Sequence, residues 1–211
     1  MFVISIFEKK LKKILPLFSY VFHPIFIPLL GTVFYVLLDT SFLTKPQYLI
    51  LFLQIIIITF LLPIAFFYLL RTFGKIDNIM LADSSHRRIP LLLHIMLLTV
   101  LITKSITLER FPVLFYFFLG GIVSTALAFI GLYFKTKASI HMIGISALTV
   151  FIIGLSIKNE INTINLVTFF VFINGLVASS RLVMKAHTTK ELLIGFLGGL
   201  VPQLGLLYFW L

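Results

Sequence analysis

Four side chains close to the carboxyl end of the chain have the types and the spacing that phosphoryl chemistry needs. Ser180 and Arg181 are followed after five residues by His187, and His187 is followed after three residues by Glu191. The planar fork of arginine donors matches phosphate oxygens, and a neutral imidazole can attack phosphorus. The tract 180–191 therefore predicts a site that binds a phosphate group and transfers it to a histidine.

His187 and Glu191 are four residues apart at the start of an apolar segment, so a helix there places both side chains on one face. A carboxylate bonded to one ring nitrogen would fix the tautomer and stabilise the cation that forms during attack. Thr188 and Glu191 also have the spacing of a helix capping box, which needs the glutamate for structure alone. The sequence leaves both roles open for Glu191.

The tract resembles the third signature of the type 2 phosphatidic acid phosphatase and vanadium haloperoxidase superfamily, which reads Ser-Arg, five residues, His, three residues, Asp. Ser180, Arg181 and His187 match this signature, and Glu191 stands where the family has aspartate. The resemblance implies a hydrolase that needs neither metal nor cofactor. In such an enzyme Ser180 and Arg181 bind the phosphate, His187 forms a phospho-histidine, and Glu191 orients His187.

A second match is the segment Ala138-Ser139-Ile140-His141, which resembles the family's Pro-Ser-Gly-His signature in its serine and histidine. By this resemblance, His141 protonates the departing oxygen, and Ser139 with nearby backbone N–H groups holds the phosphoryl group. Ile140 keeps an N–H but lacks the conformational freedom of glycine. Lys137, just before this segment, is a further candidate phosphate ligand.

The family's first signature reads Lys, six residues, Arg-Pro, and this chain has Arg87-Arg88-Ile89-Pro90. Met80 or Leu81 stands where the family has lysine, depending on which arginine is counted. Lys75 or one of the paired arginines would then supply the missing cation, and Arg87 and Arg88 are both candidate phosphate ligands. These departures leave two alternatives, a divergent phosphatase and a catalytically inactive relative that binds or transports a phosphorylated lipid.

The composition indicates the setting of this chemistry. Of 211 residues, 60% are hydrophobic and 11% are charged, and the mean hydropathy is +1.15. These values are typical of an integral membrane protein, and the apolar runs leave no room for a separate soluble domain. We therefore expect one membrane domain over residues 1–211, an all-α bundle of transmembrane helices.

Apolar segments bounded by charged or polar breaks predict about seven helices. They cover the run up to Leu38, bent by Pro24 and Pro28, and residues 48–70, 90–107, 111–134, 141–157, 163–183 and 189–210. The segment 90–107 is short and contains His94 and Lys104, so six spans are an alternative. The last segment carries Gly195 and Gly199, which also follow the signature in many relatives and permit close helix contact.

Seven alternating spans would place the polar segments 71–89, 135–140 and 184–188 on one membrane face, together with the N-terminus. That face has thirteen of the 17 Lys and Arg residues, and the other face has four: Lys45, Lys104, Arg110 and Lys158. The positive-inside rule then favours a cytoplasmic site in a bacterial inner membrane. Cations that bind phosphate carry no topological information, however, and relatives often act at the outer face.

Other classes of function fit the sequence less well. There is no cysteine, and the two aspartates Asp77 and Asp83 lack the paired carboxylate-rich motifs of a magnesium-dependent prenyltransferase. The basic residues stand at the ends of apolar runs, which is typical of contact with lipid headgroups instead of nucleic acid.

A signal peptide is disfavoured because the first apolar run continues to Leu38. His23 and His94 have no partner at ligand spacing, and we interpret them as packed side chains.

These observations predict an integral-membrane phosphatase acting on a lipid phosphate or diphosphate. The lipid bilayer and a phosphorylated lipid are its expected partners, because an acyl or prenyl tail can stay in the bilayer while the headgroup reaches the polar face. Undecaprenyl diphosphate, phosphatidylglycerol phosphate, phosphatidic acid and lipid A phosphate all share this chemistry.

Overall fold

The described part of the chain is helical throughout. The computed structural model describes the backbone of residues 2–38, 44–74 and 87–211, with side chains from Leu11 onward. Its helices are α1 (Phe2–Val21), the 3-10 turn η1 (Pro24–Phe26), α2 (Ile27–Leu38), α3 (Lys45–Ile56), the π-helical turn η2 (Ile57–Leu61), α4 (Leu62–Thr72), α5 (Arg88–Lys104), α6 (Pro112–Tyr133), α7 (Ile140–Lys158), α8 (Ile164–Val183) and α9 (Thr189–Leu207). The predicted all-α bundle is confirmed.

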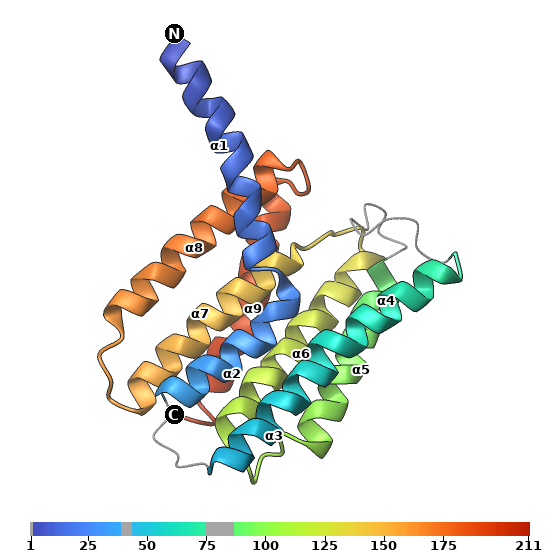
Figure 1. The fold of residues 1–211 in the computed structure, drawn as a ribbon, viewed down its shortest axis with the longest axis vertical. Helices are drawn as coiled ribbons and strands as arrows, with labels where there is room; N and C mark the ends of the chain where they lie inside the picture. Colours follow the sequence, from blue (N-terminus) through green and yellow to red (C-terminus); the bar gives the residue numbers. More distant parts are fainter. Residues whose placement is uncertain (1, 39–43, 75–86) are drawn as a thin grey trace.

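Six helical segments in the described residues are long and apolar enough to cross a membrane: Leu11–Leu38, Lys45–Thr72, Pro112–Tyr133, Ile140–Lys158, Ile164–Val183 and Thr189–Leu207. The predicted third span is α5, which has 17 residues and lies along α6 (Figure 1). At about 1.5 Å per residue such a helix falls short of a hydrocarbon core of about 30 Å. The described part of the bundle therefore has six helical segments that are long enough to span a membrane and one shorter helix beside them.

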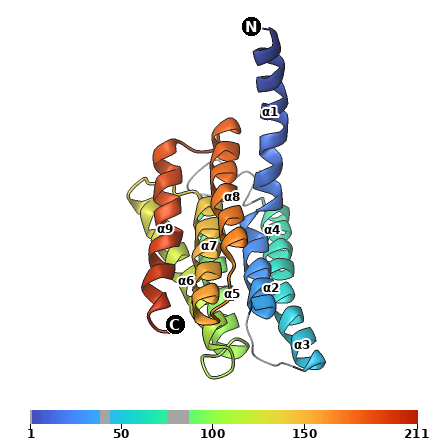
Figure 2. The same ribbon diagram turned by 90° about the vertical axis from the view of Figure 1, so that its left-hand side faces the viewer.

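The first span is bent where the sequence predicts it. Helix α1 ends at Val21, and the 3-10 turn η1 begins at Pro24, which has no N–H to continue the helix. The backbone N–H of Ile25 donates to Nδ1 of His23 at 3.3 Å, so this histidine caps the turn. The amino-terminal half of α1 extends beyond the bundle, as Figures 1 and 2 show.

Helix α7 forms the centre of the bundle, between α2, α6, α8 and α9. Its residues Leu148, Phe151 and Leu155 are fully buried. Two glycines allow α9 to pack directly on α7, since a Cβ atom on Gly195 would lie 2.6 Å from the carbonyl oxygen of Ser139 and one on Gly199 would meet the carbonyl of Ile143. The predicted close contact at these glycines is confirmed.

The chain direction alternates, so the ends of α4, α6 and α8 lie at the same end of the bundle as the starts of α5, α7 and α9 (Figure 1). We call this the site end. The predicted convergence of three separate segments on one face is therefore confirmed for their described parts. Residues 75–86, which include Lys75, Asp77, Met80, Leu81 and Asp83, lie outside the described residues.

Candidate functional site

His187 lies in the short connection between α8 and α9. Helix α8 is terminated by Lys185, whose φ of 52° is left-handed, and the N–H of Ala186 donates to the carbonyl of Arg181 at 3.1 Å. This turn directs the chain back toward the bundle, and only 2% of the His187 side chain is exposed. The imidazole is thus held inside the site end.

Glu191 performs both of the roles that the sequence left open. Its Oε2 lies 3.1 Å from Nδ1 of His187 and also accepts the N–H of Thr188 at 3.0 Å. The capping box is completed by the N–H of Glu191, which donates to Oγ1 of Thr188 at 3.3 Å. Because a carboxylate only accepts, Nδ1 of His187 must donate, and its Nε2, which bonds to no described residue, keeps a lone pair.

The surroundings of His187 favour its neutral form. Burial, followed by the positive charges of Arg87 and Arg181, lowers the pKa of His187 to about 4, against the opposing effect of Glu191. A histidine with this pKa is unprotonated at neutral pH, which is the state that a nucleophile requires.

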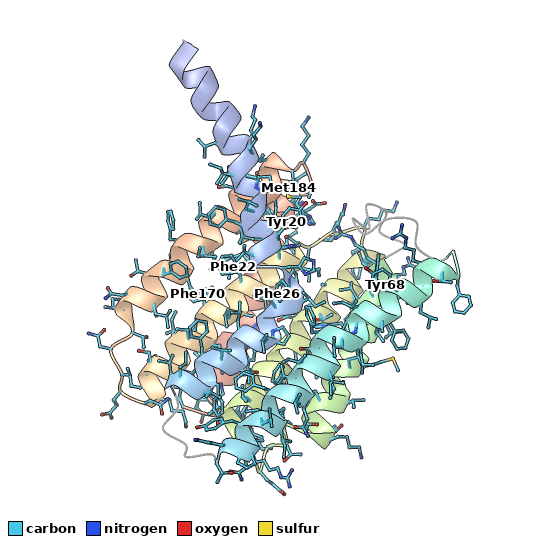
Figure 3. All side chains as sticks on the ribbon, in the orientation of Figure 1. Tyr20, Phe22, Phe26, Tyr68, Phe170 and Met184 are labelled. Carbon is cyan, nitrogen blue, oxygen red and sulfur yellow. The ribbon has the colours of Figure 1, made fainter. Side chains whose placement is uncertain are left out.

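Arg181, in the last turn of α8, supplies the central cation of the site. Its positive charge acts on the rings of His23, His141 and His187. Its Nε is buried without a hydrogen-bond partner among the described residues, and its Nη1 makes only a long contact of 3.9 Å to Sδ of Met184, a residue labelled in Figure 3. A buried guanidinium donor with no protein partner is suited to an anionic ligand.

His141, in the first turn of α7, is joined to the bend of the first span. Its Nε2 lies 3.1 Å from the carbonyl oxygen of Ser19, so Nε2 donates and Nδ1 remains for a ligand. The rings of His23 and His141 meet edge to face, with centroids 5.1 Å apart. His23, interpreted from the sequence as a packed or interfacial side chain, thus packs against a candidate site residue; the only signal for this contact in the sequence is its position before Pro24, at the bend.

The two serines expected to bind phosphate are engaged by the protein. The hydroxyls of Ser180 and Ser19 are 2.6 Å apart and buried, so Ser180 joins α8 to α1. Ser139 is fully buried, and its N–H donates to the carbonyl of Glu191 at 3.2 Å because Gly195 lets α9 approach. Its backbone N–H is therefore occupied, whereas its hydroxyl has no partner among the described residues.

The structure separates the paired arginines. The guanidinium carbon of Arg88 lies 5.0 Å from the ring centroid of Tyr133, so Arg88 stacks on the end of α6. Arg87 instead acts electrostatically on Arg181, His187 and Glu191, and burial followed by the charge of Arg181 lowers its pKa. Lys137 interacts electrostatically with Glu191. Arg87 and Lys137 therefore belong to the site, and Arg88 is outside it.

Comparisons of the chain with family models, with curated proteins and with solved structures find no match. Within the described residues, no three His, Asp or Glu side chains gather where they could hold a metal ion. The arrangement brings together a neutral histidine oriented by a carboxylate, two arginines that act on it, and a second histidine with one ring nitrogen available. Such a set can bind a phosphate group and attack it.

Proposed function

We propose that this protein is an integral-membrane phosphatase that hydrolyses lipid phosphates or diphosphates, and that it is a divergent member of the type 2 phosphatidic acid phosphatase superfamily. The observation that carries the proposal is the pair formed by His187 and Glu191, 3.1 Å apart and under the charges of Arg87 and Arg181. A carboxylate-oriented neutral imidazole beside two cations is the arrangement that phosphoryl transfer to histidine requires.

In the proposed reaction, Nε2 of His187 attacks phosphorus in line with the bond to the leaving oxygen. The P–N bond forms as the P–O bond breaks, and the electron pair remains on the departing oxygen, which takes a proton from Nδ1 of the protonated His141. Arg87 and Arg181 balance the charge on the equatorial oxygens. A water molecule then attacks phosphorus and gives a proton to Nδ1 of His141. The P–N bond breaks and its electron pair returns to Nε2, which releases phosphate and restores neutral His187 and protonated His141.

The protonation of His141 depends on the substrate in this scheme. Its Nε2–H donates to the carbonyl oxygen of Ser19, so a second proton on the ring would be carried by Nδ1. A phosphate dianion bound between Arg181 and His141 would favour the imidazolium, because an opposite charge nearby stabilises the protonated ring. Substrate binding would thus prepare the general acid.

The position of the site supports a lipid as the substrate. His187 and His141 lie at the end of membrane-spanning helices, where a headgroup can enter while its tail stays in the bilayer. Apolar side chains that are exposed near this end, including Val21, Leu182 and Leu193, would be compatible with such a tail. Lateral diffusion would then deliver the substrate.

The charge bias favours a cytoplasmic site end in a bacterial inner membrane. A reporter fused after Leu211 tests this part of the proposal. With six full spans and α5 as a seventh crossing, the two ends of the chain lie on opposite sides of the membrane. We expect the reporter outside the cytoplasm. If the reporter is cytoplasmic and the protein is active, the site end lies at the outer face of the membrane.

The activity is tested with purified protein and a series of lipid phosphates and diphosphates, by measuring phosphate release. We expect release by the wild type, none by His187→Ala, and strong impairment of His141→Ala. Brief incubation with labelled substrate should also trap an acid-labile, base-stable phosphoprotein that is absent in His187→Ala. No release from any substrate, or undiminished release by His187→Ala, would contradict the proposed catalysis.

A second function, binding or transport of a phosphorylated lipid without turnover, is favoured by one specific observation. The backbone N–H of Ser139, one of the N–H groups in the segment that resembles the second signature, donates to the backbone carbonyl of Glu191 and is not available to a phosphate. Lipid phosphates that bind, and that bind more weakly to Arg181→Gln, without any phosphate release would support this alternative.

A further inference from the structure

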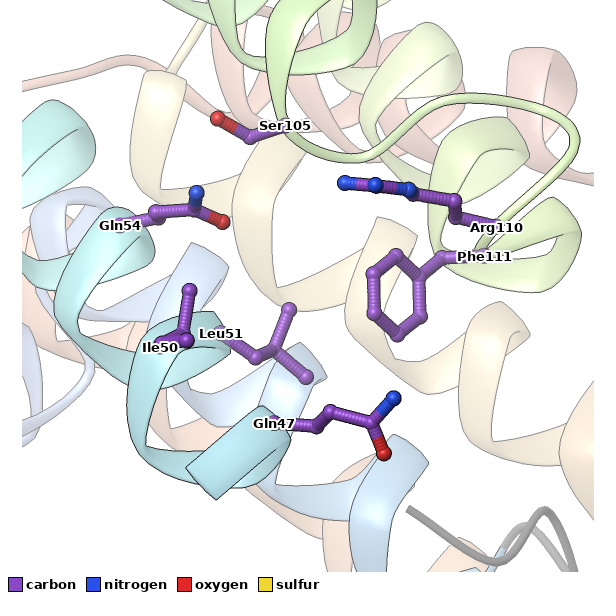
Figure 4. Close-up of a pocket in the computed structure, with 7 residues that line it drawn as sticks. All are labelled: Gln47, Ile50, Leu51, Gln54, Ser105, Arg110 and Phe111. Atoms are coloured by element: carbon purple, nitrogen blue, oxygen red, sulfur yellow. The ribbon is translucent and has the colours of Figure 1, made fainter. Parts of the chain in front are cut away.

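A second polar cavity lies at the end of the bundle opposite to the site end. It has a volume of about 340 Å³ and lies between α3 and the turn that joins α5 to α6 (Figure 4). Ligand pockets in proteins begin at about this size. The proposed phosphatase activity makes no use of this cavity.

Four polar side chains line the cavity, two from each side. Gln47 and Gln54 project from α3, and Ser105 and Arg110 face them from the connection between α5 and α6 (Figure 4). Oε1 of Gln47 accepts the N–H of Thr44 at 2.8 Å, which leaves the amide NH₂ group of Gln47 as a donor. The side chains of Gln54, Ser105 and Arg110 have no hydrogen-bond partner among the described residues.

The described residues that line the cavity carry one positive charge, that of Arg110. Among these described residues there is no carboxylate, and Arg110 forms no ion pair with any described residue. Its guanidinium extends across the opening toward Gln54 and Ser105 (Figure 4). An arginine with no ion-pair partner in the described part of the chain, facing amide and hydroxyl donors, matches the oxygens of a phosphate or a carboxylate.

The remaining walls are apolar and indicate the rest of the ligand. Ile50, Leu51 and Phe111 line the cavity beneath the polar groups. Of these, Ile50 is exposed and lies on a membrane-spanning segment. A ligand with an anionic head and an apolar tail would satisfy both parts, with the head at Arg110 and the tail along α3.

We propose that this cavity binds the anionic headgroup of an amphiphile in the leaflet opposite to the site end, with Arg110 as the principal ligand to its phosphate or carboxylate. Gln47, Gln54 and Ser105 donate to the remaining oxygens of the headgroup. The cavity is separate from His187, so this proposal can be tested independently of the proposed phosphatase activity.

Native mass spectrometry of the full-length protein in detergent tests the proposal. The protein is titrated with phosphatidylglycerol, with phosphatidylcholine and with inorganic phosphate. We compare Arg110→Gln and Gln54→Leu with Lys104→Gln, a control that removes an exposed charge close to the cavity but does not line it. All variants keep the site end, so lipid bound there contributes equally to each measurement.

We expect Arg110→Gln to bind phosphatidylglycerol about tenfold more weakly, as expected for a lost charge-assisted contact, and Gln54→Leu to lose less. Lys104→Gln should bind like the wild type, phosphatidylcholine should bind weakly to all, and millimolar phosphate should not displace the lipid. Equal phosphatidylglycerol binding by all variants, equal binding of both lipids, or displacement by phosphate alone would overturn the proposal. If Arg110→Gln does not fold, Gln54→Leu and Arg110→Lys decide in its place.

Discussion

Nδ1 of His187 and Oε2 of Glu191 lie 3.1 Å apart, and the same carboxylate oxygen accepts the N–H of Thr188. One oxygen therefore fixes the imidazole tautomer and caps the first turn of α9. The capping bond holds the carboxylate in position. The helix start and the orientation of the nucleophile are thereby coupled through a single side chain.

This coupling gives a prediction for Glu191→Gln. A glutamine can still accept the N–H of Thr188, so the apparent melting temperature should change little. The glutamine is neutral, however, so it no longer stabilises the positive charge that forms on the His187 ring when Nε2 attacks phosphorus. We expect kcat to fall by roughly 10²- to 10⁴-fold, on the scale seen when a triad carboxylate becomes an amide.

Thr188→Ala is the matched control, because it removes the cap and keeps the carboxylate. It should cost about 1 kcal/mol of stability and leave most of the activity. If Glu191→Gln melts early while retaining full kcat, the role of Glu191 is confined to capping.

The low pKa of His187 gives a prediction for pH dependence. Its folded value of about 4 lies below the ordinary 6.5, so the unfolded chain binds more protons between these values. The contribution of His187 to stability is therefore complete above about pH 6.5 and decreases as pH falls toward 4. The acid limb of kcat/KM that belongs to this group should likewise lie near pH 4.

The arginine charges that lower this pKa can be separated experimentally. Arg87→Gln removes one of them and should move the pKa of His187 toward 6.5, whereas Arg88→Gln should leave it unchanged because Arg88 stacks on Tyr133. Titration of the imidazole by NMR in the ligand-free protein measures both shifts. Equal shifts in the two variants would contradict the assignment of Arg87 to the site.

Much of the site could be predicted because its determinants are local in sequence. The four-residue spacing of His187 and Glu191 predicts their contact, although His187 stands just before the N-cap Thr188 and reaches Glu191 from outside the helix. Alternating spans bring the three polar segments to one end. Gly195 and Gly199 have helical spacing and mark the side of α9 that faces α7. None of these inferences requires the orientation of helices that are distant in the chain.

The contacts that could not be predicted depend on such orientations. His141 and Ser19 are 122 residues apart, and Ser180 and Ser19 are 161 apart, so both contacts require α1 to be placed against α7 and α8. The same placement brings His23 to His141. Likewise, the distinction between Arg87 and Arg88 depends on where α5 begins and on the proximity of Tyr133.

The position of Ser180 gives a prediction that separates packing from phosphate binding. Ser180→Ala leaves the hydroxyl of Ser19 buried without this partner and should cost about 1–3 kcal/mol of stability. The KM for a lipid phosphate should stay within about twofold, well below the tenfold that 1.4 kcal/mol of lost binding would produce.

Arg181→Lys keeps the positive charge but loses the forked donors of the guanidinium. This variant should instead weaken substrate binding with little loss of stability. Thermal unfolding and steady-state kinetics distinguish the two, and a large KM increase in Ser180→Ala would restore that serine to the phosphate site.

The contact between α7 and α9 gives the last prediction, for which the chain offers its own controls. A methyl group at Gly199 would collide with the carbonyl of Ile143 and the hydroxyl of Ser146, whereas one at Gly198 would lie an ordinary 3.6 Å from Ile143, and one at Gly205 would meet nothing within 4 Å. Gly199→Ala must therefore displace α9 from α7, at a cost of about 1–3 kcal/mol, and shift His187 relative to His141. Gly198→Ala and Gly205→Ala should be neutral or slightly stabilising, because alanine favours the helix. Apparent melting temperatures and phosphate release measure the difference, and equal behaviour of the three variants would show that close packing at Gly199 does not position the site.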